Sequence, residues 1–95
     1  MWDMGTTEVR PHDHVLYRSV PGAGGVLLDL ERREYYALDD VAARMWEELS
    51  GTGRAERVVE VLAQEYDVEA AILEEDVDRF VQRLVESDLV HLSTN

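Results

Sequence analysis

Residues 24–51 read GGVLLDLERREYYALDDVAARMWEELSG, and this stretch decides the fold of the 95-residue chain. Residues 26–30 are aliphatic and favour a strand, the charged residues 31–34 favour a turn, and residues 35–38 favour a second strand. An aspartate at position 39 or 40 is a typical N-cap for a helix that runs to about residue 49. Its apolar residues at the helical period are Val41, Ala42, Met45, Trp46 and Leu49. The stretch therefore predicts a β-hairpin that leads directly into an amphipathic helix.

The residues before this stretch predict a loose tail and one more strand. Residues 1–11 mix polar residues with Gly5 and Pro11, so we expect a flexible N-terminal tail, followed by a single domain over residues 12–92. Residues 12–20 alternate as a strand does, and the glycine-rich residues 21–25 form the loop into the hairpin. Glycine-rich loops bind phosphate where a helix begins after them; a strand follows here, so we expect a simple turn.

Alternation along the hairpin assigns each strand residue to a face, because successive strand side chains point to opposite sides. The residues expected in the core are Val26, Leu28, Leu30, Tyr36 and Leu38. The residues expected on the more exposed face are Leu27, Asp29, Glu31, Glu34, Tyr35 and Ala37.

Two further helices are predicted, over residues 55–66 and 71–86, from apolar residues at the helical period. Their apolar stripes are Val58, Val59, Leu62 and Tyr66, then Leu73, Val77, Phe80, Val81, Leu84 and Val85. Leu89, Val90 and Leu92 are expected to close the core. The order of elements predicts an α+β, winged-helix-like fold, with a three-stranded antiparallel meander followed by three helices.

The charge of the chain excludes several kinds of partner. It has 21 acidic residues against nine arginines, a net charge of −12 that disfavours nucleic acid and anionic membrane and favours a cationic or neutral peptide. Winged-helix proteins often read DNA with a recognition helix, but residues 69–88 hold seven acids against Arg79 and Arg83. The chain has no cysteine, no apolar run of about 20 residues and no signal-peptide pattern, so we expect a cytoplasmic protein.

Few residues suggest chemistry. His12 and His14 would share one face of a strand and could hold zinc, but such a site needs a third ligand, and surface histidines are the simpler interpretation. No Ser–His–Asp, Cys–His or paired-carboxylate pattern stands out. We therefore expect no enzyme activity, no metal and no cofactor.

The strand over residues 35–38 is expected at an edge of the meander. An edge strand offers unpaired N–H and C=O groups to an added strand, and this one has no Pro or Lys to deter pairing. The helix over residues 71–86 could pack beside it and leave a groove. From spacing alone, a peptide-docking edge and a short, harmless edge are equally open.

A resemblance distinguishes these alternatives. Its marks are Gly25, Leu27-Leu28-Asp29, Tyr36-x-Leu38-Asp39, Ala42, Met45-Trp46, and Gly51 or Gly53; then Val58 to Tyr66-Asp67-Val68, Asp76-Val77-x-x-Phe80-Val81-x-x-Leu84 and Leu89-Val90. In this order they resemble the PqqD-like family of peptide-binding domains, the RiPP recognition elements, over roughly residues 14–92.

The resemblance implies a non-catalytic adaptor. In that family, the leader segment of a ribosomal precursor peptide adds as a strand to the third strand and lies against the third helix. A stand-alone domain of this size is similar to the lasso-peptide proteins that present the precursor to a cysteine-protease-type leader peptidase and a cyclase; the alternative is a chaperone serving a radical-SAM enzyme. The peptide-binding residues it implies are Leu27, Asp29, Glu34, Tyr35, Tyr36, Ala37, Leu38, Asp76, Val77, Arg79, Phe80, Val81, Arg83 and Leu84.

Overall fold

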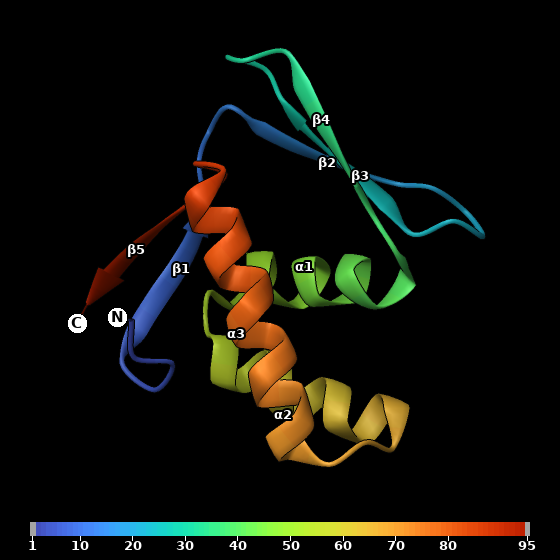
Figure 1. Ribbon diagram of the computed structural model, residues 1–95, viewed down its shortest axis with the longest axis vertical. Helices are drawn as coiled ribbons and strands as arrows, with labels where there is room; N and C mark the ends of the chain where they lie inside the picture. Colours follow the sequence, from blue (N-terminus) through green and yellow to red (C-terminus); the bar gives the residue numbers. More distant parts are fainter. Residues whose placement is uncertain (1, 95) are drawn as a thin grey trace.

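The computed structural model describes residues 2–94, which form two small sheets and three helices (Figure 1). Strands β2 (Val15–Ser19), β3 (Gly25–Asp29) and β4 (Glu34–Leu38) make an antiparallel sheet in chain order. Helices α1 (Asp40–Thr52), α2 (Ala55–Tyr66) and α3 (Ala70–Glu86) follow. The predicted α+β, winged-helix-like arrangement of a meander followed by three helices is confirmed.

A second sheet, which the sequence did not predict, joins the two ends of the chain. Strand β1 (Thr7–Pro11) pairs with β5 (Val90–Thr94), with Val9 opposite Leu92. Thr7 and Val9 are buried, and the Val9 N–H donates to the Gly53 carbonyl at 2.8 Å. The flexible tail expected over residues 1–11 is therefore wrong for 7–11, while residue 1 lies outside the described residues. The partner strand is some eighty residues away, so local pattern could not reveal it.

The assignment of faces on β3 was also wrong. Leu27 and Asp29 are buried, whereas Leu30 is exposed and Val26 and Leu28 are only half-buried. The reason is the register: Leu27 lies directly opposite Tyr36 in the β3–β4 ladder, and opposed residues share a face. Because β4 turns Tyr36 inward, as predicted, Leu27 has to point inward with it.

The three helices pack their predicted faces into one core. Its helical members are Ala43, Met45, Trp46, Leu49, Ala55, Val58, Val59, Leu62, Leu73, Val77, Val81 and Leu84. Three predicted core positions, Val41, Tyr66 and Val85, are instead exposed. Asp39 caps α1 by accepting the Ala42 N–H at 2.8 Å.

Helices α1 and α2 are also linked by charge. Arg44 of α1 donates to Glu65 of α2 at 2.7 Å and to Glu48 of its own helix at 3.1 Å. These bonds raise the pKa of Arg44, and the Arg44 bond lowers the pKa of Glu65. Across residues 2–94, none of the helices is long and apolar enough to cross a membrane.

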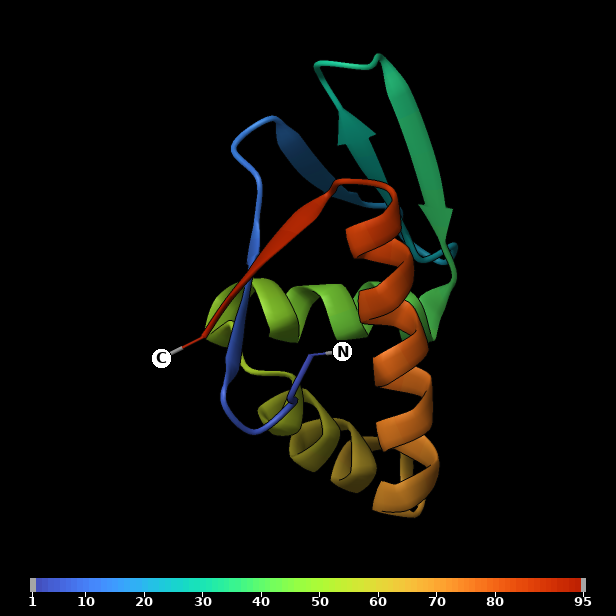
Figure 2. The same cartoon turned by 60° about the vertical axis from the view of Figure 1, so that its left-hand side comes forward.

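The placement of α3 matters most for the site. Figures 1 and 2 show its C-terminal end beside the β2–β3–β4 sheet, with α2 at the far end of the molecule from that sheet. Strand β4 runs from the hairpin turn towards α1, so β4, the start of α1 and the later turns of α3 surround one region of the surface.

Candidate functional site

Strand β4 is an edge strand. Within residues 2–94 it pairs with β3 on one side and has no strand on the other. Its inward residues are Tyr36, half-buried, and Leu38, buried, while Glu34, Tyr35 and Ala37 are exposed. The unpaired side of β4 therefore offers main-chain donors and acceptors to a further strand.

A hollow of about 360 Å³ lies between β4 and α3, and we call it the strand–helix hollow. Tyr36, Ala37 and Leu38 line it from β4. The side chains that line it from α3 and the residues after the helix are Phe80, Arg83, Leu84, Glu86, Ser87 and Leu89, and Leu27 contributes from β3. Apolar side chains thus line the cavity from both β4 and α3, and Arg83 and Glu86 add charged groups on the α3 side.

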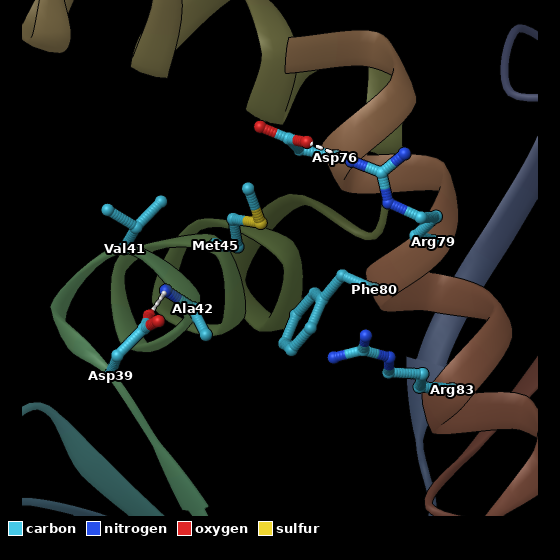
Figure 3. A pocket seen from close by; sticks show the side chains of 8 residues that line it. All are labelled: Asp39, Val41, Ala42, Met45, Asp76, Arg79, Phe80 and Arg83. Atoms are coloured by element: carbon cyan, nitrogen blue, oxygen red, sulfur yellow. Dashed lines mark hydrogen bonds and ion pairs between the residues drawn. The ribbon is translucent and has the colours of Figure 1, made fainter. Parts of the chain in front are cut away.

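A second hollow of about 370 Å³, the helix–helix hollow, continues from the first between α1 and α3 (Figure 3). It is lined by Asp39, Val41, Ala42, Met45, Asp76, Arg79, Phe80 and Arg83. Asp39, Ala42, Phe80 and Arg83 line both hollows, so the two form one continuous groove. Figure 3 shows the Phe80 ring reaching from α3 towards α1, where the hollows meet.

The hairpin turn is tied to the end of α3 by one arginine. Arg32 donates to the Ser87 carbonyl at 2.9 Å and to the Asp88 carboxylate at 3.3 Å. Since the turn carries β4, this pair of contacts sets the distance between the two walls of the groove. The groove is therefore formed without a ligand, which lowers the ordering cost of binding.

Asp29 shapes that turn and does not line the groove. Its buried Oδ1 accepts the N–H groups of Arg32 and Glu31, both at 3.0 Å. The pKa of Asp29 lies below its ordinary value, mainly because the carboxylate accepts the N–H of Arg32. The N–H of Glu31 and the nearby side chains of His14 and Arg32 lower this pKa further. The carboxylate thus takes the place of a main-chain acceptor in the turn, which explains why an acid is tolerated on the inner face.

The structure brings most of the predicted site residues together in the groove. Those that line it are Leu27, Tyr36, Ala37, Leu38, Asp76, Arg79, Phe80, Arg83 and Leu84. Val77 and Val81 are buried in the core instead, and Glu34 and Tyr35 lie with Asp29 around a separate shallow hollow at the hairpin.

Sequence reasoning missed the contribution of α1. The groove residues it did not predict are Asp39, Val41, Ala42, Met45, Glu86, Ser87 and Leu89. Val41 and Ala42 were assigned to the core because they fit the apolar period of the helix. The sequence did carry one signal that α1 could line a groove. Ala42, one turn before Met45 and Trp46, is small, and a small side chain at the start of a helix leaves room beside it.

The three histidines lie close together but do not converge on a point. The ring centroids of His12 and His14 are 5.1 Å apart with planes 15° apart, and His91 lies 5.0 Å from His12. The nitrogen lone pairs of stacked imidazoles lie in two nearly parallel planes, whereas a zinc ion needs the lone pairs of its ligands to converge on one point. Over residues 2–94 no group of three or more ligand side chains is arranged to hold a metal. The structure thus gives no support to the zinc hypothesis.

Comparison with known proteins identifies the family of this fold and groove. Residues 24–90 match the family described as coenzyme PQQ synthesis protein D (PqqD). The chain belongs to the PqqD family. This confirms the resemblance drawn from the ordered motifs. A search of curated proteins gave no match.

Solved structures extend the PqqD comparison. TbiB1 in complex with the TbiA(beta) leader peptide is 29% identical, with a TM-score of 0.79 over 86% of this chain and 94% of that one. A lasso peptide synthetase B1 complexed with the leader peptide is 30% identical, with a TM-score of 0.79 over 88% and 98%. The PqqD truncation of Methylobacterium extorquens PqqCD, described as a stand-alone RiPP recognition element, is 22% identical with a TM-score of 0.68 over 90% and 88%, and supports the fold alone.

Proposed function

We propose that this PqqD-family chain is a RiPP recognition element of a lasso-peptide pathway. It binds the leader segment of a ribosomal precursor peptide as an added strand on β4. It then presents the peptide to a separate cysteine-protease-type leader peptidase and a cyclase, and carries out no chemistry itself. The observation that carries the proposal is the unpaired edge of β4 next to an open apolar hollow.

The geometry suits strand addition. Main-chain bonds to β4 would supply affinity that does not depend on sequence, and alternate side chains of the peptide would enter the groove and supply specificity. On the wall of the groove, Tyr36 and Leu38 face inward, and the exposed Ala37 between them leaves the edge uncrowded. The two relatives at 29% and 30% identity are both described as complexes with leader peptides, which supports a leader peptide as the ligand.

Presentation to an enzyme is the second part of the proposal. An adaptor that holds the leader and also contacts an enzyme raises the effective concentration of the precursor at that enzyme. The similarity to a lasso peptide synthetase B1 favours a leader peptidase and cyclase as the recipients. The match to the PqqD family favours the alternative, a chaperone that serves a radical-SAM enzyme. The genes beside this one distinguish them: a short precursor, a small protease and an asparagine-synthetase-like cyclase support the lasso pathway.

A regulator that reads DNA is the weaker alternative. The segment from residue 69 to residue 88, which contains α3, carries seven acids against two arginines and so has a net charge of −5. A helix of that charge would be repelled by the phosphates on either side of the major groove. Retention of the protein on duplex DNA at low salt would contradict the adaptor proposal.

The binding site is tested by placing a charge in the groove. Phe80→Asp puts a carboxylate where both hollows meet, and we expect the dissociation constant for a fluorescein-labelled leader peptide to rise about 100-fold, from lost apolar contact and an unpaired charge. Fluorescence anisotropy measures binding, and circular dichroism verifies the fold. Val81→Asp is unsuitable because Val81 is fully buried and its replacement would unfold the domain.

The matched control is Ile72→Asp. Ile72 lies on the same helix, is half exposed and lines neither hollow, so the same kind of charge there should leave binding unchanged. A folded Phe80→Asp protein that binds leader as tightly as Ile72→Asp would show that the groove is not the binding site.

A further inference from the structure

The guanidinium of Arg83 lies where the two hollows join. Arg83 lines both of them and is exposed. In Figure 3 its side chain extends from α3 alongside the Phe80 ring towards the cavity, and no dashed line engages it. A peptide that occupied the groove would therefore pass directly over this group.

Arg83 differs from the other arginine of the groove. Arg79 is tied to Asp76, one turn earlier on α3. For Arg83, no acidic group among residues 2–94 comes within the 4.0 Å that defines an ion pair, although the chain has 21 acids. The positions one turn away on the helix hold Arg79, Phe80, Glu86 and Ser87, and the only acid among them, Glu86, makes no ion pair with it. A strongly acidic protein thus leaves one cation open in the middle of its groove.

Two other carboxylates of the groove have partners of their own. Asp39 accepts the N–H of Ala42 at the start of α1, and Asp76, two turns before Arg83 on α3, accepts from Arg79. Neither carboxylate comes within 4.0 Å of the Arg83 guanidinium. The planar fork of N–H donors on a guanidinium matches a carboxylate better than any other group that a peptide offers.

We infer that the groove takes a peptide carrying an Asp or Glu side chain at the position that passes Phe80, and that Arg83 binds this carboxylate. The inference rests on the proposed function, because it needs a peptide in the groove. Apolar residues on either side of the acid would occupy the strand–helix and helix–helix hollows. The preferred peptide thus has one acidic residue between apolar ones.

The net charge of −12 alone would favour a cationic peptide, and the two effects act over different distances. At physiological salt the field of distant surface acids falls off within about 8 Å. A carboxylate in contact with Arg83 interacts at hydrogen-bond distance, where screening is weakest. The contact therefore decides which side chain is preferred at this position, while the distant acids act on the charge of the peptide as a whole.

Selection from a random peptide library tests the inference and does not require the leader sequence. Random 12-residue peptides, displayed with fixed sequence on both sides so that no terminal carboxylate is free, are selected on wild type, on Arg83→Gln and on the control Arg57→Gln, whose arginine lies on α2 and lines neither hollow. We expect wild type and Arg57→Gln to enrich Asp and Glu at one position relative to the apolar residues, and Arg83→Gln to lose that enrichment. Circular dichroism verifies that each variant is folded.

A titration then measures the contact itself. For one selected peptide, replacing the acid by its amide should weaken binding to wild type and to Arg57→Gln about fivefold, the upper range for an exposed ion pair, and should leave binding to Arg83→Gln within about twofold. Peptides selected without an enriched acid, or an equal amide effect in Arg83→Gln, would overturn the inference and leave the proposed function standing. If wild type selects no peptide whose binding is weakened by Phe80→Asp, no peptide occupies the groove, and the proposed function and the inference both fail.

Discussion

The contact between Arg32 and the end of α3 predicts a measurable link between stability and binding. Arg32→Met keeps most of the aliphatic stem of the side chain and removes the guanidinium that bonds the Ser87 carbonyl and the Asp88 carboxylate. The variant also loses the ion pair at 3.7 Å between the Arg32 guanidinium and the buried Asp29 carboxylate. We expect the variant to fold, to be less stable and to bind peptide less tightly.

The main part of the effect follows from the contacts of Arg32 with Ser87 and Asp88, and loss of the longer Arg32–Asp29 pair adds to it. A hydrogen bond to a main-chain carbonyl contributes about 1 kcal/mol and an exposed ion pair about 0.5 kcal/mol, so the free energy of unfolding should fall by about 1–2 kcal/mol. For a domain of this size, that corresponds to a loss of roughly 5–15 °C in the unfolding temperature. Peptide binding cannot lose more free energy than these contacts contribute to holding the walls of the groove in place. The dissociation constant for a leader peptide should therefore rise by at most about 5- to 30-fold.

Urea unfolding followed by tryptophan fluorescence measures the stability, because Trp46 is buried in the core. The control is Arg33→Met, the next residue, for which no hydrogen bond or ion pair is found among residues 2–94. At 1 M salt, the wild-type advantage should shrink but persist, since the Asp88 pair is screened and the Ser87 bond is not. Equal stability of the Arg32→Met and Arg33→Met proteins would refute the idea that Arg32 holds the hairpin in place.

Two further predictions concern the core and the α1–α2 link. Leu27→Ala should cost about 2–5 kcal/mol in urea unfolding because Leu27 is fully buried, whereas Leu28→Ala on the outer face should cost under about 1 kcal/mol. Glu65 has a folded pKa below its ordinary 4.5 because Arg44 donates to it, so its contribution to stability is present above that pH and is lost as pH falls through the folded pKa. Wild type should therefore exceed Glu65→Gln in urea midpoint at pH 7, and the difference should narrow as the pH is lowered below 4.5 through the folded pKa of Glu65. A difference that stays constant over this range would contradict the pairing.

The hairpin shows how far the sequence could specify the site. The two strands, their turn and the helix cap followed from local composition, and the inward faces of Tyr36 and Leu38 were correct. The face of β3 was wrong because three aliphatic residues, Val26, Leu28 and Leu30, outnumbered Leu27. The β3–β4 pairing decides the face instead, because Leu27 lies opposite Tyr36 and shares its inward face. Asp29 is tolerated on that face because its carboxylate accepts two N–H groups of the turn.

Helix α3 sets a second limit. Its period identifies the buried stripe of Leu73, Val77, Val81 and Leu84. Asp76, Phe80 and Arg83, each one residue before or after a buried position, form the adjacent stripe that faces the groove. Which neighbouring stripe faces β4 depends on how the helix crosses the sheet. The crossing of α3 over the sheet and the pairing of β1 with β5 are both features of tertiary structure. The local sequence pattern does not predict either of them.

The stretch that decides the fold also supplies half of the residues that line the groove. Leu27 and β4 form one wall, and Asp39, Val41, Ala42 and Met45 of the following cap and helix form the far end, so that α3 has to add only the opposite wall. Folding and binding therefore depend on the same local unit. A substitution at Asp39 should act on both, because its carboxylate caps α1 and lines both hollows. Conversely, a ligand in the groove contacts the hairpin, the start of α1 and α3 at once. Its binding should stabilise the domain against unfolding, and above the dissociation constant the gain should grow with the logarithm of the peptide concentration.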